Sequence, residues 1–320
     1  MIEAPLLSSP AESRARLTRS AALASLATAL LLALLKSWAA WRTGSTAMLG
    51  SLADTALDLV ASLATLIGVW VAAMPADEDH RFGHGKAEAL AAMFQVILIV
   101  LSAGAIAFRA VTRLIEGGRT EAAVEGIGVS LVAILATLVL IAWQRHVIRR
   151  TGSIAIRTDS VHYQSDLLLN LAVIAALASD QYLGWSQADP LFGLAIAAWL
   201  LWGAWRASRA AVDNLMDREW PEDKRLRFVE RAALHPELSK LHDLRTRTSG
   251  DRDFAQFHVD LPATMTVAEA HAVIERVEAD LCRAFPGTDM LIHIDPEGHV
   301  DEPGNTLVES DEFDRLEDKR

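Results

Sequence analysis

Cysteine is nearly absent from this chain, since Cys282 is the only one among its 320 residues. An intrachain disulfide is therefore impossible, and a metal site built from several thiolates is excluded. Net positive charge is also lacking: the formal charge is −11 and the pI is about 5.4, which argues against nucleic acid as a partner. The sequence has no His-Glu-x-x-His pattern, which weakens an interpretation as a zinc hydrolase. Any metal here must be held by carboxylate and imidazole groups.

Long hydrophobic runs, by contrast, are abundant in the first two thirds of the chain. Hydrophobic residues make up 52% of the sequence and its mean hydropathy is +0.23, with nearly all of the excess before about residue 215. This uneven distribution predicts a membrane part followed by a soluble part. Six runs are long enough to cross a hydrocarbon layer about 30 Å thick, and they span residues 21–41, 48–74, 87–114, 124–143, 154–179 and 190–207.

The ends of these runs predict how the chain is oriented in the membrane. The first residues lack the pattern of a cleaved signal peptide, because Glu3 and Glu12 precede a basic cluster and the first run is too long. Lys36, near the far end of that run, is expected to reach the interface with its amine. Basic residues gather on one side of the six spans, which the positive-inside rule assigns to the cytoplasm together with both chain termini; they are Arg14, Arg16, Arg19, Arg81, Lys86, Arg145, Arg149, Arg150, Arg157, Arg206 and Arg209.

The remainder of the chain has the pattern of a small soluble domain. Residues 222–234 and 267–285 have the period of amphipathic helices, whereas 238–248, 253–261 and 289–294 are strand-like. The order αββαβ predicts an α+β domain with helices on one face of a sheet. The expected parts are a flexible leader (1–15), an all-α transmembrane domain of six helices (16–213), an α+β domain (214–297) and an acidic disordered tail (298–320).

Two pairs of metal-capable side chains lie inside the predicted spans. Asp54 and Asp58 are four residues apart, and so are His162 and Asp166, which puts each pair on one face of its helix. Lone polar residues in membranes often only join helices by hydrogen bonds. Three carboxylates near one another would repel unless a cation entered, so a metal site is the favoured interpretation. Three carboxylates and one imidazole favour tetrahedral Zn²⁺, and Cd²⁺ would also fit.

Two further groups of residues are metal-site candidates with an ordinary alternative. In the loop after the second run, His80 and His84 are four apart and Asp77 could complete three ligands, but acids and histidines are also common in charged loops beside a membrane. In the soluble domain, a two-metal cluster bridged by a carboxylate competes with scattered surface histidines. Its candidate ligands are His242, His258, His271, His293 and Asp295, of which the last two alternate on a strand and face the same way.

Long stretches of the sequence resemble the cation diffusion facilitator family. The resemblance covers roughly residues 15–297. It implies a homodimer of six-span protomers in a bacterial inner membrane, whose cytoplasmic domains have a metallochaperone-like fold and pair with each other. The matching stretches are Asp54-x-x-x-Asp58, the loop 75–88, His-Tyr-Gln-Ser-Asp at 162–166, His-Asp-Leu-Arg-Thr-Arg at 242–247 and Ile-His-Ile-Asp-Pro at 292–296.

The resemblance also implies roles for the candidate residues. The four intramembrane residues match the family's transport site, the three loop residues match a second site, and the five soluble-domain residues match a binuclear site at the dimer interface. Lys86 and Asp217 match a pair of charges that interlocks the dimer at the boundary between membrane and cytoplasm. We expect the binuclear site to regulate transport.

The expected function is export of divalent transition-metal cations, Zn²⁺ first and also Cd²⁺ or Fe²⁺, in exchange for protons. Ligands must lose protons to bind a metal, and His162 is the natural coupling residue because the ordinary pKa of imidazole is about 6.5. A membrane-bound metal sensor without transport is the alternative. An enzyme is not expected, because a metallohydrolase needs an activated water at an open metal position. A channel is disfavoured because tight multidentate binding opposes rapid release.

Overall fold

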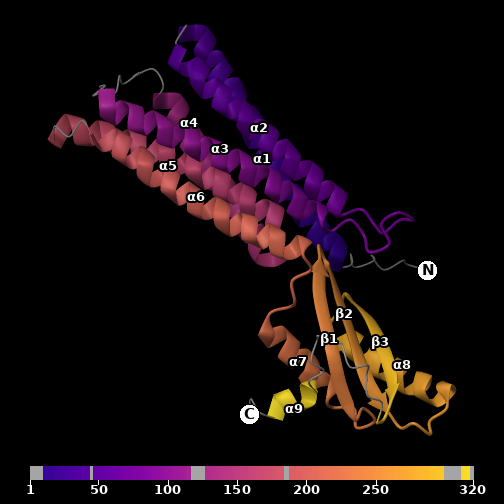
Figure 1. Ribbon diagram of the computed structural model, residues 1–320. Helices are drawn as coiled ribbons and strands as arrows, with labels where there is room; N and C mark the ends of the chain where they lie inside the picture. The colour runs from indigo at the N-terminus through magenta and orange to yellow at the C-terminus, as the bar shows by residue number, and fades with distance from the viewer. Residues whose placement is uncertain (1–9, 44–45, 117–126, 184–186, 299–310, 318–320) are drawn as a thin grey trace, which may run out of the picture. The chain divides into compact units, whose positions relative to one another are not determined.

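The structure is a computed structural model that describes residues 10–43, 46–116, 127–183, 187–298 and 311–317. The chain divides into two compact units, Met1–Asp213 and Asn214–Arg320. The long helices belong to the first unit and the sheet belongs to the second (Figure 1).

Six long helices build the described part of the first unit. Helices of 25 to 34 residues extend about 38 to 51 Å, which exceeds the roughly 30 Å of a hydrocarbon layer. Five helices in the described residues are long and apolar enough to cross a membrane. The bounds are α1 (Pro10–Thr43), α2 (Thr46–Ala72), α3 (Ala87–Glu116), α4 (Ile127–Thr151), α5 (Ile154–Leu183) and α6 (Ala188–Leu215).

The helix outside this apolar group is α5. It has 30 residues, but Arg157, Asp159, His162 and Asp166 interrupt its apolar surface. The prediction of an all-α membrane domain is confirmed, and α5 carries two of the candidate ligands. Two helices run further than the apolar runs predict, because polarity marks the membrane boundary and not the end of a helix: α1 begins inside the predicted leader, and α4 continues beyond residue 143.

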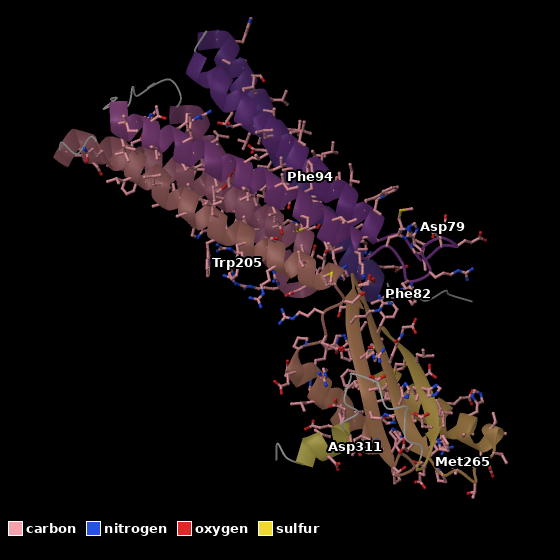
Figure 2. The ribbon with its side chains drawn as sticks, in the orientation of Figure 1. Asp79, Phe82, Phe94, Trp205, Met265 and Asp311 are labelled. Carbon is pink, nitrogen blue, oxygen red and sulfur yellow. The ribbon has the colours of Figure 1, made fainter. Side chains whose placement is uncertain are left out.

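Small residues let the helices of the first unit approach closely. A Cβ at Gly68 of α2 would lie 2.3 Å from the Cβ of Ala91 on α3, and one at Gly203 of α6 would lie 2.9 Å from a side chain of α5. Large apolar side chains point outward instead: Phe94 and Trp205, labelled in Figure 2, are 41% and 53% exposed. Small residues at the contacts and large apolar ones outside are the pattern expected of helices surrounded by lipid.

A three-stranded sheet in the order β1-β2-β3 forms the centre of the second unit. β1 and β2 pair antiparallel, whereas β2 and β3 pair parallel because α8 connects them. Side chains of α7, α8 and the strands meet in one core around Phe228, Phe257 and Leu281. The predicted αββαβ order is confirmed, with bounds α7 (Glu222–Ala232), β1 (Lys240–Ser249), β2 (Arg252–Leu261), α8 (Val267–Ala284) and β3 (Thr288–Pro296).

A short helix, α9 (Glu312–Glu317), lies in the segment for which the sequence predicts a disordered tail. Leu316 is buried in the core of the second unit, and Phe313 packs against that core. Arg225 of α7 forms an ion pair with Glu312 at 3.0 Å. Two apolar residues three positions apart thus hold this acidic segment against the domain, where composition alone predicts no order.

We predict that Leu316→Ala destabilises the second unit by about 2 kcal/mol, near the lower end for a buried leucine because α9 is short. Unfolding of the second unit can be followed in the full chain through its single cysteine, Cys282 of α8. Burial raises the pKa of this thiol, so a thiol reagent labels it more slowly in the folded state than in the unfolded state. Thiol labelling across a denaturant series gives the stability. The control is Asp314→Ala at an exposed position of the same helix. Equal midpoints for both variants and the wild type would show that α9 contributes nothing.

Candidate metal sites

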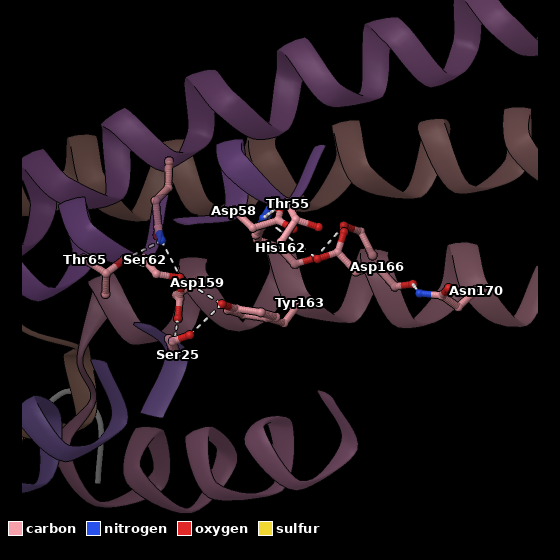
Figure 3. Close-up of polar contacts among 12 residues, drawn as sticks. Ser25, Thr55, Asp58, Ser62, Thr65, Asp159, His162, Tyr163, Asp166 and Asn170 are labelled. Atoms are coloured by element: carbon pink, nitrogen blue, oxygen red, sulfur yellow. Dashed lines mark hydrogen bonds and ion pairs between the residues drawn. The ribbon is translucent and has the colours of Figure 1, made fainter. Parts of the chain in front are cut away.

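Helices α2 and α5 bring together three of the four predicted intramembrane ligands (Figure 3). Nε2 of His162 lies 2.9 Å from Oδ1 of Asp58 and 3.9 Å from Oδ2 of Asp166. One ligand atom from each residue falls within 4.8 Å of the others. A tetrahedral zinc ion with bonds of about 2.0–2.2 Å holds its ligand atoms about 3.4 Å apart. Small side-chain shifts therefore suffice to close these three groups around an ion.

Asp54 does not join this group among the described residues, and its side chain is exposed. It precedes Asp58 by one turn of α2 and acts electrostatically on Asp166. The spacing of four places both acids on one helix face, but it also separates them by about 6 Å along the axis. Only Asp58 lies within reach of His162, so a fourth protein ligand stays a prediction.

Lys36 of α1 approaches the part of α2 that carries the two acids. Its Nζ donates to Oγ1 of Thr55 at 2.6 Å, and Thr55 is fully buried. Lys36 also acts electrostatically on Asp166. That this amine reaches the membrane interface stays a prediction; in the structure it binds Thr55, and its positive charge partly balances the carboxylate of Asp166.

A further carboxyl group, Asp159, is fully buried one turn before His162 on α5 and is missing from the sequence-based candidates. Its position inside a predicted span could have identified it as a functional candidate, because placing an ionisable group at membrane depth costs free energy and is rare without a function. Its partners were not predictable, because they are single polar residues on four different helices that only the fold brings together: Ser25, Thr65, Gln95 and Gln144.

The three predicted loop residues also lie together, in the segment between α2 and α3. The carboxylate oxygens of Asp77 lie 3.3 Å from Nδ1 of His80 and 3.3 Å from Nε2 of His84, and the two rings are 4.6 Å apart. The backbone N–H of His80 donates to Asp77 at 2.6 Å, which lowers the pKa of this carboxyl group. Half of the Asp77 side chain is exposed, so an ion held by these groups would keep a position open to water.

Local geometry orients His84 toward this group. Its Nδ1 lies 3.1 Å from the carbonyl oxygen of Pro75, which can only accept a hydrogen bond, so neutral His84 carries its hydrogen on Nδ1. The lone pair of Nε2 then faces Asp77, as in metal sites whose histidines are held by a second hydrogen bond. Gly83 has a φ of +80°, which favours glycine, and lies in the turn that returns His84 toward Asp77.

We predict that Zn²⁺ binding by the loop group weakens as the pH falls, because both histidines must lose protons to bind the metal, whereas the lowered pKa of Asp77 keeps this carboxylate ionised. The apparent dissociation constant should rise by about tenfold per pH unit for each histidine that is protonated. Calorimetric titration of the full chain and of His84→Ala isolates the loop contribution by difference. His146→Ala, on α4, is the matched control. A loop affinity that is constant between about pH 7.5 and 5.5 contradicts this prediction.

In the second unit, strand register brings the predicted ligands to one place on the sheet. His242 lies opposite His258 across β1 and β2, and His258 lies opposite His293 across β2 and β3. Oδ2 of Asp295 is 2.9 Å from Nδ1 of His258 and 3.6 Å from Nε2 of His242. Asp295 is 6% exposed, and it lies between two imidazoles as a bridging carboxylate would.

The other two predicted members differ from each other in position. His293 is mostly exposed, but its ring centroid is 4.6 Å from that of His258 and its Nε2 is 3.4 Å from Asp295. His271 lies on α8, is 70% exposed and pairs with Glu275 at 3.4 Å. Among the described residues the structure does not bring His271 into the group, so its role as a ligand stays a prediction.

Two acids that the sequence analysis did not consider lie beside these histidines. Asp260 is 3.2 Å from Nε2 of His242, and Asp243 is 3.8 Å from Nε2 of His258. Asp260 could have been predicted as a neighbour of the histidines, because it follows His258 by two residues on a strand and therefore lies on the same face of the sheet. Asp243 could not have been predicted in this way. The pairing of β1 is irregular between His242 and Arg245, and Asp243 has a φ of 49°, so strand alternation does not describe its position.

The predicted charge pair is divided between the two units. Lys86 directly precedes α3 in the first unit, and Asp217 follows α6 in the second. Within its own unit Asp217 lies 3.4 Å from a guanidinium nitrogen of Arg247. An interlock between Lys86 and Asp217 in a dimer stays a prediction.

Comparison with known proteins gives matches along most of the chain. Residues 22–216 match the model of the cation efflux transmembrane domain, and residues 220–297 match that of the cation efflux protein cytoplasmic domain. The cation-efflux pump FieF of Salmonella arizonae is 42% identical over 281 residues, covering 88% of this chain and 93% of that protein. FieF of Yersinia pestis is 44% identical over 282 residues, covering 88% and 94%.

A solved structure described as the putative zinc transporter CzrB in its zinc form is 33% identical to part of this chain. The match covers 27% of this chain and 99% of the other, with a TM-score of 0.24.

Proposed function

Because the chain belongs to the cation efflux family, we propose that it exports divalent transition-metal cations from the cytoplasm by antiport with protons. Zn²⁺ is the first cargo of this proposal, and Cd²⁺ and Fe²⁺ are further ones. Members of this family are transporters and not enzymes. The observation that carries the proposal is the group of Asp58, His162 and Asp166, whose metal-capable atoms join two helices of the membrane domain.

The chemistry of this group supports zinc as cargo. Carboxylates alone suit harder ions such as Mg²⁺ and Mn²⁺, whereas an imidazole moves the preference toward Zn²⁺ and similar ions. Zinc binds four ligands in a tetrahedron. The three gathered groups supply three positions, and Asp54 supplies the fourth from the same face of α2.

Competition for one nitrogen explains how protons exchange with metal. Nε2 of His162 lies at hydrogen-bond distance, 2.9 Å, from the carboxylate of Asp58. A carboxylate only accepts hydrogen bonds, so this nitrogen carries a hydrogen in that contact. Zinc binds to the same nitrogen only after the hydrogen has left. Because the two residues belong to different helices, exchange of metal for proton also changes the contact between α2 and α5.

The second unit supplies regulation and pairing in this proposal. Metal bound at His242, His258 and Asp295 bridges three strands, with His293 and His271 as further ligands, and its binding favours the transport-ready homodimer. Lys86 and Asp217 interlock that dimer at the membrane boundary. Both chain termini face the cytoplasm of a bacterial inner membrane, in agreement with the distribution of basic residues.

We predict that Asp166→Ala abolishes proton-driven zinc transport, with a fall in flux of at least about 100-fold. Changes to groups that only orient a metal ligand already cost 10- to 100-fold, and this change removes a ligand. The measurement is Zn²⁺ uptake into proteoliposomes under an imposed pH gradient. Asp223→Ala, at an exposed acid of the second unit, is the control and should transport like the wild type.

The same assay separates the proposal from its alternatives. Normal flux in Asp166→Ala would mean that the transport site lies elsewhere. Saturable zinc binding without flux in the wild type would favour a membrane-bound metal sensor. Uptake that ignores the pH gradient would leave a zinc carrier that is not coupled to protons.

Asp54→Asn tests the fourth ligand separately. We predict that it weakens zinc binding at the transport site about as much as Asp58→Asn does, because a ligand is lost in either case. The measurement is the Zn²⁺ dissociation constant of the full chain, with the loop group removed in all variants by Asp77→Ala and the group on the sheet removed by Asp295→Ala. Wild-type affinity in Asp54→Asn would instead indicate three protein ligands completed by water.

A further inference from the structure

Asp159 of α5 lies at the centre of a polar cluster within the first unit (Figure 3). Its Oδ2 accepts hydrogen bonds from Oγ of Ser25 at 2.5 Å and from Nε2 of Gln144 at 2.8 Å. Its Oδ1 accepts from Nε2 of Gln95 at 2.9 Å and lies 3.5 Å from Oγ1 of Thr65. One carboxyl group on α5 therefore contacts α1, α2, α3 and α4.

The surroundings of this carboxyl group are buried and neutral. Asp159 has no exposed surface, and the four residues that contact it are at most 1% exposed. In the part of the chain that the structure describes, no basic side chain hydrogen-bonds to Asp159. The hydrogen bonds that it receives from α1 to α4 all come from neutral groups, and His162 and Tyr163 of α5 itself interact with it electrostatically. An ionised Asp159 thus has hydrogen-bond donors but no paired cation.

The hydrogen bonds around Asp159 can be satisfied in both of its protonation states. When it is ionised, the hydroxyl of Ser25 donates to Oδ2. When it is protonated on Oδ2, it donates to Oγ of Ser25, and the Ser25 hydroxyl donates to the backbone carbonyl of Ala21, which lies 3.1 Å away. Gln144 donates to both Ser25 and Asp159 in either case. A proton can therefore be taken up or released while every heavy atom keeps its place and its partners.

We propose that Asp159 is a proton-binding site of this protein, with Ser25 as the acceptor of the hydrogen bond from its protonated form. The inference rests on the proton-coupled export proposed for the chain, and it adds a carrier of the counter-ion that is not itself a metal ligand. The bound proton comes from hydronium in the surrounding water: one O–H bond of hydronium breaks and leaves a water molecule, one O–H bond forms at Oδ2, and no oxidation state changes.

Its position couples this proton to the metal. Asp159 precedes His162 by three residues, about 4.5 Å along the helix axis, so the charge of a metal ion bound at His162 acts on it through a medium of low dielectric. A bound cation favours the ionised carboxylate, and loss of the cation favours the protonated one. Because four other helices hydrogen-bond to the same carboxyl group, its charge also affects how tightly the bundle closes around α5.

The test is the number of protons released per Zn²⁺ bound, measured on the full chain by calorimetry in buffers of different ionisation enthalpy over a pH series. Asp159→Asn replaces the acid by an uncharged group of the same shape. We expect it to release about one proton fewer per protomer, with an unchanged zinc affinity at the highest pH. Asp159→Glu should restore the wild-type number. The same proton count in Asp159→Asn and the wild type would overturn the inference.

A second variant keeps the test decisive if Asp159→Asn does not bind zinc. Ser25→Ala retains the carboxyl group and removes its hydrogen-bond partner, so the pH at which that proton is released should move. The matched control is Ser62→Ala, which removes a partner of Tyr163 at 2.8 Å in the same cluster but does not touch Asp159. A release profile in Ser25→Ala that coincides with those of the control and the wild type would also overturn the inference.

Transport measurements on the same variants keep the two proposals apart. No gradient-driven zinc flux in the wild type would overturn the proposed export, whatever the proton counts are. Coupled flux in the wild type together with equal proton release in Asp159→Asn would overturn only the role of Asp159.

Discussion

Hydrogen-bond satisfaction of ionisable groups within the membrane helices is the constraint on which the first unit depends. No water is available in a hydrocarbon layer to solvate them, so each needs a partner from the protein. α5 carries Asp159, His162 and Asp166; the hydrogen-bond partners of Asp159 and His162 come from other helices, whereas Asp166 pairs with His162 of α5 itself. This requirement explains why α5 contacts so many of the other helices: α1, α2, α3 and α4 all supply hydrogen-bonding groups to it.

The same constraint is met in two chemically different ways along α5. His162 meets the carboxylate of Asp58, so two ionisable groups satisfy each other and can instead bind a cation. Asp159 meets only neutral donors, which satisfy a carboxylate but offer no replacement for a metal ion. A third way is found at Glu88 of α3, which is 4% exposed and pairs with Arg14 at 3.1 Å. A permanent ion pair of that kind can join helix ends, but it cannot exchange charge during a transport cycle as readily as the other two.

Much of this arrangement could be predicted from spacing. The period of four identified Asp58, His162 and Asp166, because residues on one helix face stay on that face after folding. The same spacing could not show which of Asp54 and Asp58 lies close to His162, because that depends on how α2 is placed along α5. Asp159 was missed for a related reason: its partners are serine, threonine and glutamine residues that are ordinary in membrane helices, and no local pattern links them.

In the second unit, predictability depends on strand register. Alternation correctly grouped His293 with Asp295, and the same rule applied to β2 would have grouped His258 with Asp260. Placing His242 opposite His258 required the pairing of β1 with β2, which the sequence does not specify. α9 shows where composition fails as a predictor. The acidic composition of its segment predicts disorder, but Leu316 and Phe313 pack against the core of the second unit, and the free energy of burying these two side chains holds the segment in place.

The intramembrane group and the group on the sheet both join separate elements of the fold. The first takes His162 and Asp166 from α5 and Asp58 from α2, and the second takes one residue from each of three strands, His242, His258 and Asp295. Residues on one element keep their spacing when the protein moves, whereas contacts between elements do not. Binding a cation therefore stabilises the packing between two elements, and losing it releases that packing. A metal ion can in this way both be carried by the helices and report its presence through the sheet.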